Sequence, residues 1–300
     1  MPDPDDATRY LYFCRHDGLG FQYFALSWLL GIAEGRDCTV LVDWRSLSFV
    51  RSRKQSFTSE ALHRYFRLRH PRLIYDPAEI ERILKDEAAQ VTGAQFGRFT
   101  GPVQRSASDI PFRMIKSIAE AHDIRPRWLG PYIELAKPLQ EIHDRYVERV
   151  SRAVGVHARL GNGERLKNPA MQARMDIPFE AFFEAMDTHP DRDFLLCTDT
   201  PAFLQASLDR YGDRVMVVPR AMPPEGDGPG HLAMEGGASV GSDGLQLLGD
   251  AMLDMLLLGE CGSLICNNSA FTYHARECRG VPTQLVFDEP STYAIGWQLP

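Results

Sequence analysis

The segment Val154–Arg165, with the sequence VGVHARLGNGER, constrains this chain more than any other part of it. It begins with β-branched valines, which favour a strand, and it ends in a glycine-rich polar turn. His157 and Arg159 are two residues apart, so an extended strand directs both side chains to one face. The segment therefore predicts a buried strand that delivers polar groups into a turn.

The turn Gly161-Asn162-Gly163, followed by Glu164, fits two structures equally well when it is taken alone. Asn-Gly after an apolar run is a strong signal for a surface hairpin. Glycines also let a backbone approach a ligand closely, and the planar fork of Arg159 binds two phosphate oxygens while staying charged. The rest of the chain favours the anion site.

Apolar runs alternate with helical periodicity along the chain, which predicts an α/β fold with parallel sheets. In the first half, strand 10–14 leads into a loop that holds Gly18 and Gly20, helix 21–34 follows, and 39–43 is the next strand. Later segments are predicted as helix 76–88, loop 93–109, helix 111–121 and helix 138–150.

The second half alternates more regularly, and a polar stretch, 222–241, is predicted as a long loop. The predicted strands are 153–159, 193–197, 215–218, 263–266 and 283–287, and the predicted helices are 178–186, 201–211, 244–258 and 269–278. Polar residues follow these strands, and in open α/β sheets ligands bind at the carboxyl ends of strands.

Composition excludes several classes of protein. The chain is 44% hydrophobic and 24% charged, close to folded globular proteins, and its net charge of −7 argues against non-specific nucleic-acid binding. Its six cysteines show no CxxC spacing, which argues against a metal cluster or a disulfide framework and fits a reduced, cytoplasmic protein. The N-terminus is not a signal peptide, and no apolar run reaches membrane-spanning length.

Four blocks in order carry a family resemblance. The Gly-Val-His-x-Arg pattern of 155–159 is followed by the run 194–200, which ends in Thr-Asp-Thr, and by a third block within 253–271. The N-terminal segments 18–21 and 40–45 precede them. Together these blocks resemble the bacterial nodulation fucosyltransferases (the nodulation protein Z family), which are relatives of the animal α1,6-fucosyltransferases.

The resemblance implies two Rossmann-like domains that face a cleft, the GT-B architecture of glycosyltransferases. It implies an acceptor side in 1–137, a GDP-sugar donor domain in 138–280, and a C-terminal strand and tail in 281–300. The implied reaction moves fucose from GDP-fucose to a hydroxyl of a GlcNAc-containing or related glycan, with inversion. No metal and no other cofactor is expected, and we expect neither the membrane anchor nor the extra domains of the animal relatives.

Within the first motif, Arg159 is the expected cation for the charge that develops on the diphosphate, and the resemblance places His157 at the donor site. Glu164 is the nearest carboxylate and the candidate base for the acceptor hydroxyl. The animal branch places its presumed base further along, where this chain has Lys167, and it has a second arginine where this chain has Leu160.

Two aspartates are further donor-site candidates. Asp199 follows an apolar run and precedes Pro201, so it is expected to cap the next helix whether or not it also lines the site. Asp254 lies on an otherwise apolar helix and needs a partner, because an unpaired buried charge is costly. A guanine edge and a buried arginine fit that need equally well.

The remaining donor-site candidates are backbone or cap positions. Asn268 and Ser269 open a helix, where N–H groups favour an anion but a plain N-cap fits as well, and Phe271 matches the nodulation branch. Gly18 and Gly20 suit close approach to the donor or acceptor, or a tight turn. Two rival functions stand beside fucosyl transfer: a transferase for another nucleotide sugar, and an inactive glycan- or nucleotide-binding protein.

Overall fold

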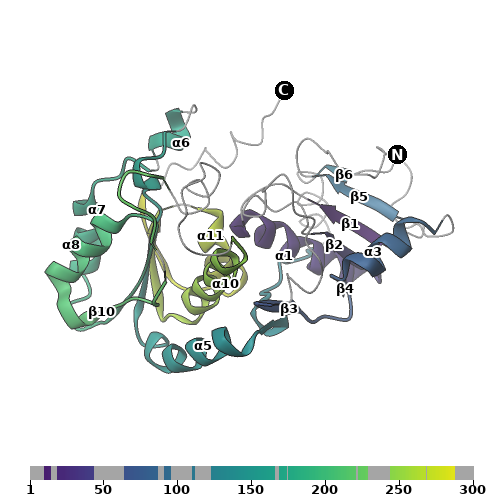
Figure 1. Cartoon of the computed structure of the whole chain (residues 1–300), viewed down its shortest axis with the longest axis horizontal. Coiled ribbons are helices and arrows are strands. Elements are labelled where there is room, and N and C mark those ends of the chain that lie inside the picture. Colours follow the sequence, from purple (N-terminus) through teal and green to yellow (C-terminus); the bar gives the residue numbers. More distant parts are fainter. Residues whose placement is uncertain are drawn as a thin grey trace. The chain divides into compact units, whose positions relative to one another are not determined.

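The computed structural model describes residues 10–14, 19–43, 64–86, 91–95, 110–111, 123–165, 169–173, 175–220, 222–228, 244–267 and 269–287. The chain divides into two compact units, Met1–Ala136 and Lys137–Pro300 (Figure 1). Among the described residues, no helix is both long enough and apolar enough to cross a membrane.

The first unit is built on a parallel sheet in the order β4-β2-β1-β5-β6. Its strands are β1 Tyr10–Cys14, β2 Thr39–Asp43, β4 Leu73–Ile74, β5 Val91–Gln95 and β6 Ile110–Pro111. A separate antiparallel pair joins β3 Phe66–Leu68 to β7 Ile133–Leu135, next to the turn η3 Gly130–Tyr132.

Two helices are described in this unit, and the start of the second shows how local sequence sets a helix end. Helix α1, Leu19–Arg36, connects β1 to β2. Helix α3, Pro77–Leu84, begins with proline in its first turn, and the Asp76 carboxylate accepts the N–H groups of its first turn. Its Ile80 and Ile83 are buried in a cluster with Tyr12 and Leu41 of the sheet.

Some expectations for the first unit are wrong. Helix α1 begins at Leu19, so Gly20 lies in its first turn and not in a loop. Residues 93–95 belong to β5, and Pro111 belongs to β6. Pairing with the central strand β1 supplies the backbone hydrogen bonds of β5, and this tertiary contact outweighs the weak strand propensity of its glycine. Residues 96–109 and 112–121 lie outside the described residues.

The second unit contains a parallel sheet in the order β10-β9-β8-β11-β12. Its strands are β8 Val154–Ala158, β9 Phe194–Thr198, β10 Val215–Met216, β11 Ser263–Asn267 and β12 Thr283–Phe287. Each lies within two residues of its predicted bounds. Because β8 pairs in parallel with both β9 and β11, the hairpin interpretation of the glycine turn is wrong.

Helices cover both faces of this sheet (Figure 1). On one side lie α7 and α8, and on the other α5, α10 and the short α11. The bounds are α5 Lys137–Val150, α6 Pro169–Ala173, α7 Phe179–Asp187, α8 Pro201–Tyr211, α10 Gly244–Glu260 and α11 Ala270–Tyr273, with the short turns η4 Gly161–Gly163, η5 Gly212–Arg214 and the π-helical η6 His274–Cys278.

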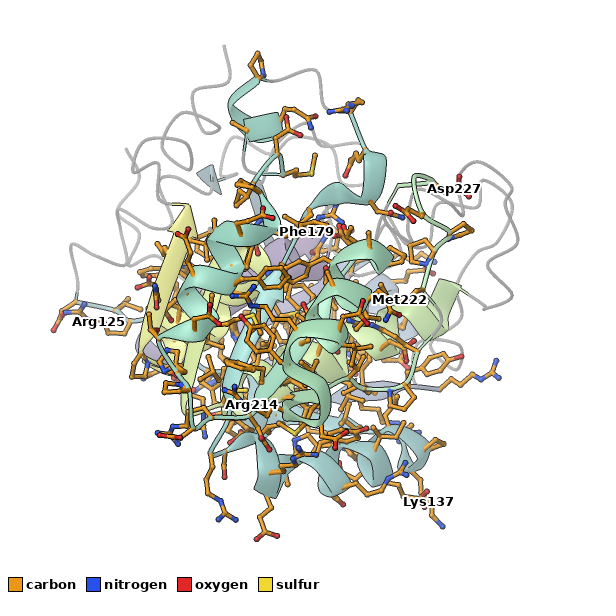
Figure 2. All side chains as sticks on the ribbon, turned by 90° about the vertical axis from the view of Figure 1, so that its left-hand side faces the viewer. Arg125, Lys137, Phe179, Arg214, Met222 and Asp227 are labelled. Atoms are coloured by element: carbon orange, nitrogen blue, oxygen red, sulfur yellow. The ribbon has the colours of Figure 1, made fainter. Side chains whose placement is uncertain are left out.

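One core cluster of the second unit lies between the sheet and the α7–α8 layer, which faces the viewer in Figure 2. Val154 and Val156 of β8 are buried in one cluster with Phe182 of α7 and Phe203 of α8. The side chain of His157 lies on the opposite face, where it contacts Phe271 of α11. Alternation along one strand therefore separates the packing residues from the polar candidate.

The chain path reverses direction across this sheet. It runs outward from β8 to β9 and β10, then crosses to β11 and continues to β12. The reversal lies between β8 and β11, and such a switch point is where open α/β sheets bind ligands. Arg159 directly follows β8, and Asn267 ends β11. The fold thus brings the first sequence motif to the preferred ligand position.

Candidate active site

Arg159 is held between two carboxylates at the carboxyl edge of the second sheet. Its Nη1 donates to Oδ2 of Asp199, and its Nη2 donates to Oε2 of Glu164 at 3.1 Å. The Arg159 side chain is 30% exposed, and those of both carboxylates are 13% exposed. Three of the residues selected from sequence therefore meet in one partly open cluster.

Asp199 organises the start of the glycine turn. Its Oδ1 accepts the N–H of Leu160 at 2.9 Å, the N–H of Gly161 at 3.2 Å and the hydroxyl of Thr200 at 3.1 Å. The expectation that Asp199 caps α8 is wrong, because that helix begins at Pro201 with no side-chain cap. The carboxylate is engaged by the neighbouring turn instead, so it fixes both the turn and the Arg159 side chain.

Asn267 fixes the Arg159 backbone from the other side. Its Nδ2 donates to the carbonyl oxygen of Arg159 at 2.7 Å, and its Oδ1 accepts the N–H of Arg159 at 3.2 Å. This pair of hydrogen bonds joins the ends of β8 and β11, which lie on either side of the switch point. Arg159 is thus anchored by residues from both neighbouring strands.

Asn162 binds a protein loop and not an open site. It is buried, with a left-handed backbone (φ 43°, ψ 49°) that asparagine tolerates better than most residues. Its Nδ2 donates to the carbonyls of Pro224 at 2.8 Å and Gly228 at 2.9 Å, and its Oδ1 accepts the N–H of Gly226 at 3.1 Å. The side chain thereby fastens the loop 222–228 to the turn.

The loop 222–228 explains why one of the two glycines in the turn, Gly163, has no room for a side chain. Both have positive φ, 77° at Gly161 and 89° at Gly163. A Cβ on Gly163 would lie 2.7 Å from the carbonyl oxygen of Gly226, and one on Gly161 would lie 2.8 Å from Sδ of Met175. Glycine is required at both positions by backbone conformation and by packing within the protein.

His157 is buried beside the arginine cluster. Its ring stacks on Phe271, with centroids 4.9 Å apart and an interplanar angle of 11°. Burial is the main cause that lowers the pKa of His157 to about 4; Asp199 opposes the shift, and the charges of Arg159 and Arg220 contribute to it. The imidazole is therefore neutral near pH 7, and its buried Nδ1 has no hydrogen-bond partner among the described residues.

Arg220 was not identified from the sequence, although Asp254 pointed to such a residue. Its Nη1 donates to Oδ2 of Asp254 and its Nη2 donates to the carbonyl of Thr198 at 3.4 Å. The side chains of Arg220 and Asp254 are only 13% and 6% exposed. Of the two partners considered for Asp254, the structure contains the buried arginine. The signal was a lone carboxylate on an apolar helix, together with an arginine shortly after a predicted strand.

Two further carboxylates have raised pKa values. Burial raises the pKa of Asp250, one turn before Asp254, to about 6, while Arg220 opposes the shift. Burial also raises the pKa of Glu164; Arg159 opposes this and Asp199 adds to it. A raised pKa brings a carboxylate closer to the range useful for a general base.

The other candidates are placed as follows. Ser269 is a plain N-cap of α11, since its hydroxyl accepts the N–H of Phe271 at 3.2 Å. Gly20 is buried in α1 of the first unit. Gly18, Lys167 and Asn268 lie outside the described residues. Among the residues that are described, no group of three or more His, Cys, Asp or Glu side chains could hold a metal ion.

Parallel α/β sheets with polar side chains at their carboxyl ends define a Rossmann-like, doubly wound fold. The chain is similar to the crystal structure of NodZ alpha-1,6-fucosyltransferase co-crystallised with GDP, with 20% identity over 95% of this chain and 97% of that one, and a TM-score of 0.55. The structure soaked with GDP-fucose gives 21% identity, 91% and 93% coverage and a TM-score of 0.52. NodZ from Bradyrhizobium gives 19% identity, 90% and 92% coverage and a TM-score of 0.54.

At these identities the similarity shows a shared fold, and it confirms the predicted α/β fold of the GT-B class. No protein-family model and no curated protein sequence matches the chain. The function therefore has to be argued from the site.

Proposed function

We propose that this chain is a glycosyltransferase that transfers fucose from GDP-fucose to a hydroxyl of a glycan acceptor. The observation that carries the proposal is the position of Arg159. A partly exposed guanidinium follows β8 at the switch point of a parallel sheet, and side chains from β11 and from the end of β9 anchor it. A fixed cation at this position suits the diphosphate of a nucleotide sugar.

The chemistry requires such a cation. As the acceptor oxygen bonds to the anomeric carbon, the bond from that carbon to the diphosphate oxygen breaks, and its electron pair leaves with GDP. Negative charge grows on the diphosphate, and a preorganised donor that meets it lowers the barrier. Glu164, which contacts Arg159, is our candidate to take the acceptor proton, and its raised pKa suits that role.

The finer assignments extend the resemblance. We propose inversion at the anomeric carbon, a GlcNAc-containing or related acceptor bound by residues 1–137, and an α1,6-type linkage. Neutral His157 supplies an uncharged hydrogen-bonding group beside the diphosphate. Arg159 takes the place of a metal ion, so turnover is expected to survive excess EDTA, and activity restored by Mn²⁺ after chelation would contradict this.

One observation favours a second candidate, a transferase for another nucleotide sugar. Asp254, the residue expected to read guanine, is paired with Arg220. If that pair persists in the complex, Asp254 contributes less to guanine selection. Base selectivity is then the property of the proposal most open to revision.

A ligand screen followed by a transfer assay tests the proposal. We expect GDP and GDP-fucose to raise the melting temperature more than UDP, ADP or CMP-linked ligands, because a ligand at 100 times its Kd adds about 2.7 kcal/mol of stability. Labelled fucose should then reach GlcNAc oligomers. A larger shift with UDP-sugars would favour the second candidate, and binding without transfer would indicate an inactive binding protein.

A further inference from the structure

The cation proposed to meet the donor is already paired. Arg159 donates one Nη nitrogen to Asp199 and the other to Glu164, so its fork is occupied by two carboxylates. A diphosphate that binds Arg159 through two oxygens must therefore replace one of them. The structure identifies which carboxylate is the less firmly held.

Asp199 is held by several groups besides Arg159. It accepts two backbone N–H groups and the Thr200 hydroxyl, and it lies directly after β9. Glu164 accepts only from Arg159 among the described residues, and it stands at the end of the turn, where Arg165 is already exposed. Loss of Glu164 from Arg159 breaks one hydrogen-bonded ion pair, whereas loss of Asp199 also releases the turn.

The charge of the site favours the same exchange. Among the described residues, Arg159 pairs with Asp199 and Glu164, and Arg220 pairs with Asp254 and acts electrostatically on Asp250. His157 contributes no positive charge near neutral pH. A diphosphate would therefore add negative charge beside carboxylates that outnumber these two arginines, and like charges close together repel. Displacing or protonating one carboxylate relieves this repulsion.

We propose that Glu164 is a counter-ion of Arg159 that the donor diphosphate displaces, and that the released carboxylate is then the group that accepts the acceptor proton. This inference rests on the proposed function. It assigns two successive roles to Glu164: it neutralises Arg159 in the free protein, and it serves as the base only once the donor is bound. A free protein would thus lack a base ready to activate water.

Proton uptake on donor binding follows from the exchange. Within the described part of the chain, the charged groups that act on Glu164 are Arg159, which lowers its pKa, and Asp199, which raises it. When the diphosphate takes Arg159, Glu164 loses its cation and gains an anionic neighbour, so its pKa rises. A group whose pKa is higher in the complex binds protons on complex formation, and donor affinity increases as pH falls through the interval between the two pKa values.

Calorimetry measures this uptake directly. GDP-fucose is titrated into the wild-type protein from pH 5 to pH 8 in pairs of buffers with different ionisation enthalpies. The sugar ester is used because its diphosphate does not titrate near neutrality, unlike that of GDP. We expect uptake of less than one proton per site that fades as pH rises, and where it has faded Glu164 is ionised in the complex and able to act as the base. Guanosine, which lacks the diphosphate, should bind without this uptake.

The variant Glu164→Gln separates the two roles. Glutamine removes the charge that competes for Arg159, so GDP-fucose should bind about twofold to fivefold more tightly above pH 7, as expected for loss of a partly exposed ion pair. Proton uptake should disappear, and kcat should fall. The matched control is Glu184→Gln, which removes one negative charge from an exposed position on α7 and should change none of these quantities.

The outcomes distinguish this inference from the proposed function. Absence of GDP-fucose binding to the wild-type protein would overturn the proposed function. Binding without proton uptake, or uptake that persists in Glu164→Gln, would overturn the exchange while leaving the function intact. Weaker donor binding in Glu164→Gln would also overturn it, because that result is expected if Glu164 merely supports the structure of the turn.

Discussion

Two arginines at the carboxyl edge of the second sheet bind carboxylates in different ways. Arg220 pairs with Asp254 where both side chains are almost fully buried. Arg159 is shared between Asp199 and Glu164, and 30% of its side chain is exposed. The first arrangement is closed to solvent, whereas the second leaves the guanidinium accessible to a ligand.

The comparison assigns stability to one arginine and function to the other, although both lie at the same edge of the sheet. A buried pair is costly to break, because either partner is left as an uncompensated charge. A partly exposed pair contributes little to stability, so its partner can be exchanged at small cost. We therefore assign the closed pair mainly to the fold and the open cluster to the donor, and the predictions below challenge that division.

The largest expected effect is on the closed pair. Arg220→Met should lower the free energy of unfolding by about 3–5 kcal/mol, because it leaves the Asp254 carboxylate buried without its cation. Chemical denaturation measures the loss, and Asp254→Leu added to Arg220→Met should restore part of it. Arg152→Met is the control, since the Arg152 side chain forms an ion pair with Glu148 in which both side chains are exposed. Equal effects of Arg220→Met and Arg152→Met would remove the distinction.

The second largest effect is expected for a substitution of Arg159, which lies in the open cluster. Arg159→Lys should lower kcat about 100-fold to 1000-fold, because lysine retains the charge but loses the fork that meets two oxygens. The affinity for GDP should fall less, since the interaction strengthens in the transition state. The melting temperature should stay within a few degrees of wild type. Near-normal kcat would remove Arg159 from catalysis, and a collapsed melting temperature would show a structural role.

A smaller effect is expected where Asn162 fastens the loop 222–228 to the turn. Asn162→Gly keeps the left-handed backbone accessible but removes three hydrogen bonds to the loop. We expect a loss of about 1–3 kcal/mol of stability from the carbonyl and N–H groups left without partners. Asn162→Ala should cost more, because alanine is strained at positive φ. Wild-type stability in both variants would show that the loop is held by other contacts.

The smallest effect is a pH dependence of stability around Arg220. The pKa of Asp250 is raised from 3.8 to about 6, so its contribution to stability is present below its unfolded pKa and is lost as pH rises through the folded value. Asp250→Asn should therefore raise the melting temperature at pH 7.5 but not at pH 4. His157 has a lowered pKa, so the stability it contributes is instead lost as pH falls from 6.5 toward 4. A gain from Asp250→Asn that is equal at both pH values would contradict this assignment.

The sequence predicted the strands of the second unit better than it predicted the contacts within the site. It also predicted those strands better than the strands of the first unit. Its parallel strands are buried on both faces, so they appear as continuous apolar runs between glycine, proline and helical segments. The strands of the first unit are less distinct, because β4 and β6 have only two residues each. Such short strands depend on pairing with distant strands, which no local pattern encodes.

In the site, His157, Arg159 and Glu164 share one local motif, and this made them visible in the sequence. Arg220 contacts Asp254 from 34 positions away, and Asn162 contacts a loop more than 60 positions along the chain. The periodicity of a single segment contains no information about such partners. For the same reason Asp199 was expected to cap its own helix, whereas it binds the turn after the neighbouring strand.

A crystal structure of the protein with GDP-fucose would test the central claim most directly. The account predicts diphosphate oxygens within hydrogen-bond distance of the Arg159 guanidinium, with Asp199 still bound to Arg159 and the Glu164 carboxylate moved away. It also predicts that Arg220 remains paired with Asp254. A diphosphate bound elsewhere, with the Arg159–Glu164 pair intact, would contradict the assignment of Arg159 to the donor.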